Sequence, residues 1–314
     1  MISKELAIAT YGLTKRFEGH IAVNDLDLQI KNGEVYGLIG PNGAGKTTLI
    51  KMLAMAEEPT KGEIYLNGDR LQGNSNLLKK RIGYLPDDFP LYDDLTVWDY
   101  LDYYARLYGL KSNQRHHRLL EVLELVQLEN KRQSIISTLS RGMKQRLGLA
   151  RTIVHEPILL LLDEPVSGLD PLARQQFRQI IKILQEAGMT ILISSHVLSD
   201  LAELCTSIGI MELGFLVESA PLSELYQRLS RQQIILGTLG KMEVLQEKLS
   251  QNSLVKTWEI IANNRLKVNF AGGEADCAEL LRSLVLANIP VTQFHCSSED
   301  LETIFLNLGH QQTS

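Results

Sequence analysis

Apolar residues recur with two different spacings in the first part of this 314-residue chain, one typical of strands and one typical of helices. Ala22–Ile30 alternates apolar and polar residues, which predicts a strand with one buried face. Val35–Ile39 is a short apolar run, and Thr47–Ala56 behind it has helical character. Strands alternating with helices predict an α/β fold with a mostly parallel sheet covered by helices. Later members of the same alternation are strand Ile158–Leu162, helix Pro171–Ala187 and strand Thr190–Ser194.

Two segments interrupt this core. Strand and turn signals, among them Glu63–Leu66 and the turn Asn67-Gly68-Asp69, predict an antiparallel β subdomain, and Ile82–Leu85 is predicted as a further strand. Beyond it, helix formers dominate, with apolar residues at helical spacing in Trp98–Tyr108 and Gln114–Val126. We interpret that stretch as a helical insertion over about residues 88–155.

A second unit is predicted from about Arg231 onward. The chain length suggests about two domains, and we expect one over residues 1–228 and a small α+β domain over residues 229–314. The elements predicted in the second are strand Gln233–Gly237, helix Lys241–Ser250, strands Leu254–Ile261 and Arg265–Phe270 with a turn at Asn263-Asn264, helix Glu274–Ala287, strand Pro290–Cys296 and helix Glu299–Leu308.

Composition excludes several classes of protein. The chain is 44% hydrophobic with a net charge of -5, so we expect no nucleic-acid partner, which normally requires a basic surface. Its three cysteines, Cys205, Cys277 and Cys296, have neither disulfide-framework nor metal-ligand spacing, which predicts reduced thiols. No apolar run approaches the roughly 20 residues of a membrane helix. We therefore expect no membrane span and, at a membrane, only a peripheral role.

A glycine-rich segment follows the strand Val35–Ile39 directly and fits the P-loop pattern in full. Its glycines allow backbone N–H groups to approach phosphate oxygens, and the loop opens a helix whose N-terminus favours an anion. Lys46 is expected to reach the β- and γ-phosphates of ATP, and Thr47 to bind Mg²⁺. The predicted nucleotide-binding residues of this segment are Gly40, Pro41, Asn42, Gly43, Ala44, Gly45, Lys46, Thr47 and Thr48.

Two acids end the apolar strand Ile158–Leu162. Side chains at the carboxyl ends of parallel strands face the ligand crevice of such folds. Asp163 is expected to hold Mg²⁺, directly or through water, and Glu164 to polarise the attacking water as a general base. The alternative, a core strand followed by a polar turn, loses weight beside a complete P-loop. These residues predict a P-loop NTPase with a RecA-like core.

Three further motifs resemble those of the ABC-type ATPases. Thr138-Leu-Ser140-Arg-Gly142-Met-Lys-Gln145-Arg resembles their signature motif, Ser167-Gly-Leu-Asp170 their D-loop, and His196 their switch histidine. The order and spacing of the motifs fit that family over roughly residues 6–220. The resemblance identifies the chain as an ATP-binding subunit of an ABC transporter, and the helical insertion as the family's helical subdomain.

The resemblance also implies how the motifs act. Two ATPase units, identical or different, would stack head to tail, so that Ser140 and Gly142 meet the γ-phosphate of ATP on the other unit, again at a helix start. Asp170 would shape the same interface, and His196 would contact the γ-phosphate. Phe17 is implied as the residue that stacks on adenine, with Tyr11 as the alternative, and Val23 as a neighbour of the sugar. Ser140 also fits a simple helix N-cap.

Two positions depart from the usual family pattern. Asp87 stands where the family usually has a glutamine beside Mg²⁺, and its charge lies close to the γ-phosphate. We expect weaker ATP affinity at low Mg²⁺ than in an Asp87→Gln variant. Arg141 and Met143 stand where the signature usually has glycine and glutamine, a form that resembles the branch driving ABC-2-type exporters. The segment Ser298–Leu306 is similar to the ending of exporter ATPases with a small accessory domain.

The resemblance implies transport, with ABC-2-type permease subunits as separate transmembrane partners. The protein would lie in the cytoplasm, peripheral on the inner face of the cell membrane. Helices of the permease would dock near Phe89–Tyr100, whose aromatic residues are alternatively core of the helical subdomain. A second hypothesis is an ABC ATPase of translation or repair, although the chain has one ATPase unit and no heptad tract. A third, a P-loop kinase, would have no use for Ser140 or His196.

Overall fold

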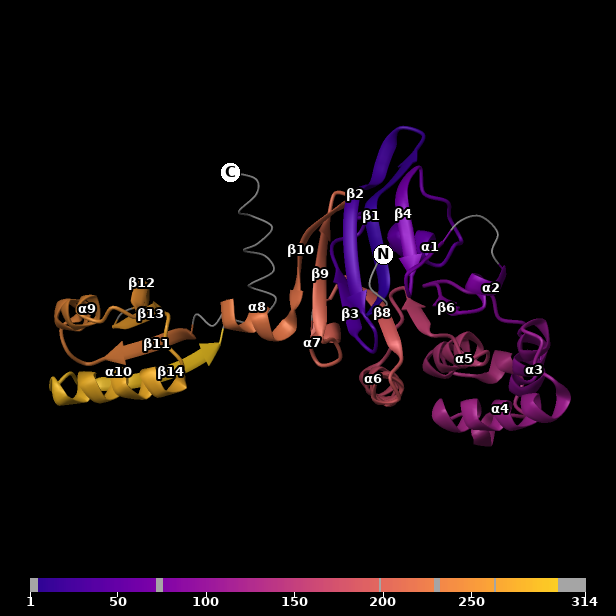
Figure 1. The fold of residues 1–314 in the computed structure, drawn as a ribbon. Helices are drawn as coiled ribbons and strands as arrows, with labels where there is room; N and C mark the ends of the chain where they lie inside the picture. Colours follow the sequence, from indigo (N-terminus) through magenta and orange to yellow (C-terminus); the bar gives the residue numbers. More distant parts are fainter. Residues whose placement is uncertain (1–4, 72–75, 198, 229–231, 263, 299–314) are drawn as a thin grey trace. The chain divides into compact units, whose positions relative to one another are not determined.

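The computed structural model describes residues 5–71, 76–197, 199–228, 232–262 and 264–298. The chain divides into two compact units, Met1–Leu222 and Ser223–Ser314, which are described separately (Figure 1). The boundary lies slightly before the one expected from the sequence.

A six-stranded sheet forms the centre of the first unit, in the order β10-β9-β3-β8-β7-β6. Neighbouring strands are parallel from β9 to β6, and only β10 runs antiparallel to its neighbour. The middle strands are fully buried, as expected for strands covered on both faces. The strands are β3 (Val35–Ile39), β6 (Ile82–Leu85), β7 (Leu159–Leu162), β8 (Thr190–Ser195), β9 (Ser207–Glu212) and β10 (Phe215–Pro221).

A second, antiparallel sheet supports the central one, as predicted for the β subdomain. Its order is β2-β1-β4-β5, and its strands are β1 (Leu6–Phe17), β2 (His20–Lys31), β4 (Lys61–Leu66) and β5 (Asp69–Arg70). Asn67 and Gly68 both have positive φ, at 48° and 84°, which fits the tight turn predicted between β4 and β5. The hydrophobic core lies between the two sheets and includes buried residues of α1 (Lys46–Leu53).

The predicted helical insertion forms a layer of helices (Figure 1). They are α3 (Val97–Leu107), α4 (Ser112–Leu125) and α5 (Arg141–Ile153), with the short turns η1 (Glu129–Lys131) and η2 (Ile136–Thr138). The remaining helices of this unit are α2 (Asn76–Lys79), α6 (Pro171–Glu186) and α7 (Ser199–Ala202).

The aromatic residues expected near a permease groove divide between surface and core. Tyr100 is fully buried, whereas Tyr92 is 47% exposed. Phe89 and Trp98 are half-buried, with Trp98 packed against His116 at a ring-centroid distance of 5.1 Å. The core interpretation therefore holds for Tyr100, and Tyr92 remains available at the surface.

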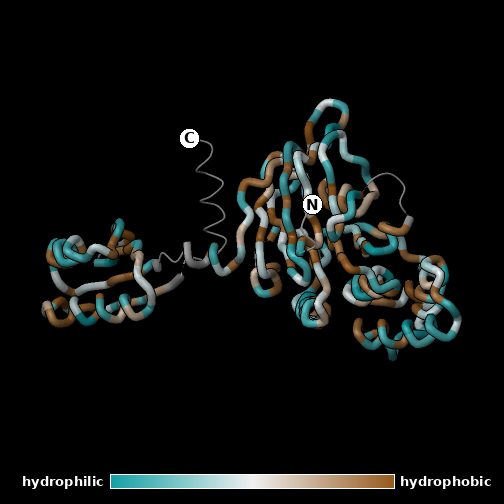
Figure 2. The backbone as a smooth tube through the Cα atoms, in the orientation of Figure 1, coloured by the Kyte–Doolittle hydropathy of each residue, from teal (hydrophilic) through white to brown (hydrophobic). Residues whose placement is uncertain are grey.

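The second unit contains an antiparallel sheet in the order β12-β13-β11-β14. Buried residues of this sheet and of α9 and α10 form its own hydrophobic core, and Figure 2 shows apolar and polar residues alternating along these helices. The predicted helix Glu299–Leu308 and the tail that contains it lie outside the described residues. The elements are α8 (Leu222–Arg228), β11 (Gln232–Thr238), α9 (Met242–Ser250), β12 (Val255–Ala262), β13 (Arg265–Phe270), α10 (Glu274–Leu286) and β14 (Val291–Ser298).

Within the described part of the chain, every helix is too short or too polar to cross a lipid bilayer.

Candidate nucleotide site

The P-loop runs from the end of β3 to the first turn of α1, as its pattern predicts. Gly45 is the N-cap of α1 and has φ 103°, a conformation that glycine adopts without strain. A Cβ at Gly40 would lie 2.2 Å from the Met211 carbonyl oxygen, and one at Gly45 would lie 2.2 Å from the Ala22 carbonyl oxygen. Both positions therefore require glycine for the loop to pack against its neighbours.

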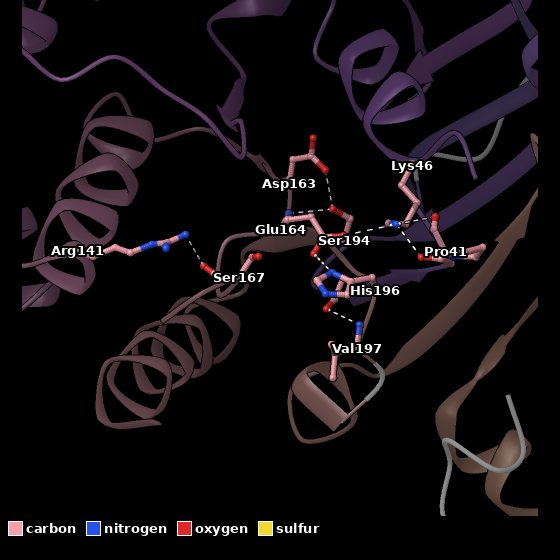
Figure 3. Close-up of polar contacts among 11 residues, drawn as sticks. Pro41, Lys46, Arg141, Asp163, Glu164, Ser167, Ser194, His196 and Val197 are labelled. Atoms are coloured by element: carbon pink, nitrogen blue, oxygen red, sulfur yellow. Dashed lines mark hydrogen bonds and ion pairs between the residues drawn. The ribbon is translucent and has the colours of Figure 1, made fainter. Parts of the chain in front are cut away.

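Lys46 lies across this loop, 6% exposed. Its Nζ donates hydrogen bonds to the carbonyl oxygens of Gly40 at 2.7 Å and Pro41 at 3.2 Å. It also lies 3.4 Å from Glu164 Oε1 (Figure 3). The ammonium group is thus held between the loop and the end of β7, where it can meet an anionic ligand.

A pocket of about 490 Å³ opens over the loop and combines residues from several parts of the first unit. The predicted residues from Asn42 to Thr48, together with Asp87 and Glu164, line it. Asn42, Gly43 and Thr47 are exposed, so the loop presents its backbone and a hydroxyl group to solvent. The remaining lining residues are His20, Ile21, Ala22 and Leu213.

Asp163 and Glu164 follow β7 and share Ser194, at the end of the neighbouring strand β8 (Figure 3). Ser194 Oγ donates to Asp163 Oδ1 at 2.7 Å and accepts from the Glu164 backbone N–H at 3.0 Å. Glu164 has φ 48°, an uncommon value for a residue with a side chain. This backbone turn directs the Glu164 carboxylate toward the pocket while Asp163 stays 1% exposed.

His196 lies next to Glu164. Its Nδ1 is 2.8 Å from Glu164 Oε2, and its side chain is 45% exposed. Glu164 therefore touches both predicted catalytic neighbours, with one carboxylate oxygen toward Lys46 and the other toward His196. The structure brings together all three residues that the sequence indicated for catalysis.

Asp87 lines the same pocket as Glu164 and is exposed to solvent. Partial burial of its carboxyl group and the negative charges of Asp163 and Glu164 raise the pKa of Asp87, and the Arg141 guanidinium opposes that rise. The direction agrees with the expected repulsion among charges of one sign.

The residues expected near the adenine base and the sugar differ in their exposure to solvent. Phe17 is 37% exposed and stacks on His20 with ring centroids 5.6 Å apart. Tyr11 instead contacts Tyr65 edge-on. Val23 is fully buried in the core, and its neighbour Ala22 forms the pocket wall.

The signature and D-loop residues lie at helix starts outside this pocket. Ser140 is the N-cap of α5 and accepts a hydrogen bond from the Met143 N–H at 3.3 Å. Asp170 is the N-cap of α6 and accepts from the Ala173 N–H at 2.9 Å. A Cβ at Gly142 would lie 2.5 Å from Ala173 Cβ, so the two helix starts are closely packed.

Sequence reasoning missed several residues of the site. Ser194 carried only a weak signal: it ends the predicted strand Thr190–Ser194, but the sequence did not place that strand beside the strand of Asp163. His20, Ile21 and Leu213 carried none, because loops from distant parts of the chain bring them to the pocket.

A P-loop between a buried strand and a helix, with two acids at the end of a parallel strand, defines a nucleotide-hydrolysing protein of the P-loop class. The family model described as ABC transporter matches residues 23–167. The chain is 34% identical to the uncharacterized ABC transporter ATP-binding protein YcbN of Bacillus subtilis, over 96% of both chains. It is 35% identical to the bacitracin transport ATP-binding protein BcrA of Enterococcus faecalis, over 98% of both.

Solved structures agree with these relatives. A structure described as the dimeric form of MJ0796, a bacterial ABC transporter cassette, superposes with a TM-score of 0.63 at 26% identity, covering 68% of this chain and 98% of the cassette. The chain therefore belongs to the ABC transporter ATP-binding proteins, ATPases that hydrolyse ATP to power transport. Its fold class, predicted from the sequence, is confirmed.

Proposed function

We propose that this chain is the energising subunit of an exporter, and that it holds ATP between its own P-loop and the signature motif of a second ATPase subunit. The observation that carries the proposal is the separation of the two halves within one chain. Lys46 and Glu164 line the P-loop pocket and His196 contacts Glu164, whereas Ser140 and Asp170 lie at helix starts outside the pocket. The dimeric cassette that the chain resembles supports this arrangement.

Glu164 is the residue proposed to polarise the attacking water. Its carboxylate is oriented from both sides, by Lys46 at 3.4 Å and by His196 at 2.8 Å. A general base needs such fixed geometry before its pKa matters. His196, half exposed beside Glu164, would contact the γ-phosphate and align the same water.

Magnesium is proposed as the metal that ATP brings to the site. Asp163 Oδ2 is buried and has no hydrogen-bond partner among the residues that the structure describes. Such an oxygen fits a cation or its bound water, because an unpaired buried carboxylate oxygen is costly. No group of three or more His, Cys, Asp or Glu side chains suited to a metal occurs in the described part of the chain. Mg²⁺ fits a site with so few protein ligands, since it binds one or two carboxylates and completes its coordination shell with phosphates and water.

Phe17 is proposed to stack on the adenine ring, since it is exposed and lies against His20, which lines the pocket. Thr47 and Asp87, which both line the pocket and are exposed, would bind the metal. Val23 would support the sugar only from behind Ala22, because its own side chain is buried.

Separate membrane subunits, of the ABC-2 type, are proposed as the partners that use this energy for export. The bacitracin transport relative aligns over nearly its whole length, including the second unit. The chain would then work in the cytoplasm, peripheral on the inner face of the cell membrane. The accessory domain, proposed over residues 229–314, would serve dimerisation or regulation. The relatives' names favour transport over a role in translation or repair.

Two measurements test the proposal. The purified chain should hydrolyse MgATP without any phosphate acceptor, and Glu164→Gln should keep ATP binding while losing at least about 100-fold in kcat. Affinity purification from membranes should recover a hydrophobic multi-span protein. Full turnover by Glu164→Gln would remove Glu164 from catalysis, and recovery with ribosomes instead would contradict transport.

A further inference from the structure

Arg141 occupies a position at which its own helix does not stabilise a positive charge. It is the first residue of α5, directly after the N-cap Ser140, and the first turn contains no acidic residue. Because the helix dipole places partial positive charge at this end, a cation here is unfavourable. A contact outside α5 stabilises the side chain instead.

This contact ties Arg141 to the turn that precedes α6. Its Nη2 donates a hydrogen bond to the Ser167 carbonyl oxygen at 3.1 Å (Figure 3). Gly168 has φ 64°, and a Cβ there would lie 2.6 Å from Nη2 and 2.7 Å from Cζ. The guanidinium thus lies against the Gly168 backbone, in space that any other residue at that position would fill.

We propose that Arg141 is a positioning residue that ties the start of α5 to the Ser167–Gly168 turn. The inference rests on the proposed function, because Ser140 and Asp170 would then face the second subunit's ATP as one rigid surface. Without this tie, the two helix starts would keep the packing of Gly142 against Ala173 but lose the hydrogen bond that holds the Ser167–Gly168 turn.

The tie can be tested without nucleotide or dimer. Arg141→Met keeps a long side chain but removes the charge and the hydrogen bond, and Lys144→Met is the matched control. Lys144 lies in the same helical turn but pairs with Asp93 at 3.1 Å. Amide hydrogen exchange of the segment 165–170 should accelerate roughly tenfold in Arg141→Met and stay unchanged in the control. Equal exchange in Arg141→Met and the unsubstituted chain would overturn the tie.

The role of the tie at the dimer interface is tested in the Glu164→Gln background, by sedimentation with MgATP. Arg141→Met should weaken ATP-dependent dimerisation roughly tenfold, with no change in Tm, and Arg141→Lys should recover part of the loss. Dimerisation of Arg141→Met as tight as that of the Glu164→Gln parent would overturn this role. A Glu164→Gln parent that never dimerises would contradict the proposed function instead, while the exchange measurement still decides the tie.

Discussion

Ser194 belongs to none of the motifs found in the sequence, yet it contacts both acids of the site. Its hydroxyl group holds the Asp163 carboxylate and the Glu164 backbone N–H at once. The acids themselves were predictable from the sequence, because an apolar strand that ends in Asp-Glu beside a P-loop is typical of a nucleotide-hydrolysing site. Ser194 was not, since its role depends on β7 and β8 being neighbours.

Ser194→Ala should lower kcat by about 10- to 100-fold, because the supporting hydrogen bonds orient the acids that act on the ligand. Stability should fall by only about 1–2 kcal/mol. Thr10→Val is the control, since the buried Thr10 hydroxyl also makes two backbone hydrogen bonds, to Leu26 and Leu28, and none of these residues lines the pocket. Steady-state ATP turnover with thermal unfolding measures both effects. Equal losses of kcat in the two variants would contradict the positioning role of Ser194.

At the scale of elements, periodic segments were predictable and their packing partners were not. The expected helix Pro171–Ala187 is α6 (Pro171–Glu186), whose start is marked by the N-cap Asp170 and a proline in the first turn. The sequence gives no comparable signal for the close contact between α5 and the segment after β6. A Cβ at Gly148 of α5 would lie 2.4 Å from the ring of Phe89 and 3.0 Å from Leu85.

Gly148→Ala should therefore destabilise the first unit by about 1–3 kcal/mol, although alanine is the better helix former, because the added methyl group collides with Phe89. Chemical denaturation measures this change. Phe89→Leu is expected to relieve part of the collision when combined with Gly148→Ala. A Gly148→Ala chain at least as stable as the unsubstituted one would show that Phe89 moves aside freely.

For the whole molecule, the order of the strands could not be read from the sequence. Gly37 of β3 pairs with Ile193 of β8 on one side and with Ile208 of β9 on the other, both far along the chain. Local patterns carry no information about such pairings, whereas alternating strands and helices did indicate the α/β class. The aromatic and sugar-side residues Phe17 and Val23 came from resemblance alone, and only Phe17 is exposed.

The partly buried side chain of His155 makes the free energy of unfolding depend on pH. Burial lowers the pKa of His155 from an ordinary 6.5 to about 4, and its Nε2 lies 3.2 Å from the Ile82 carbonyl oxygen. The unfolded chain therefore binds a proton first as the pH falls below 6.5, so stability decreases between about pH 6.5 and pH 4. The expected loss from this residue is about 2 kcal/mol between neutral pH and pH 4.5.

His155→Gln should lose less stability over that interval, whereas His117→Gln, at a side chain that is 77% exposed, should follow the unsubstituted chain. Urea unfolding at a series of pH values measures the difference. Parallel curves for the unsubstituted chain and His155→Gln would contradict a neutral, buried His155.

The central claim is that one chain carries only half of a complete ATP site. Sedimentation of the Glu164→Gln chain with and without MgATP tests it most directly, because blocked hydrolysis should trap the closed state. We predict a monomer without nucleotide and, with MgATP, a dimer containing one ATP per chain, which Ser140→Arg abolishes without preventing ATP binding. A Glu164→Gln chain that binds MgATP stoichiometrically and remains monomeric at saturation would contradict the claim.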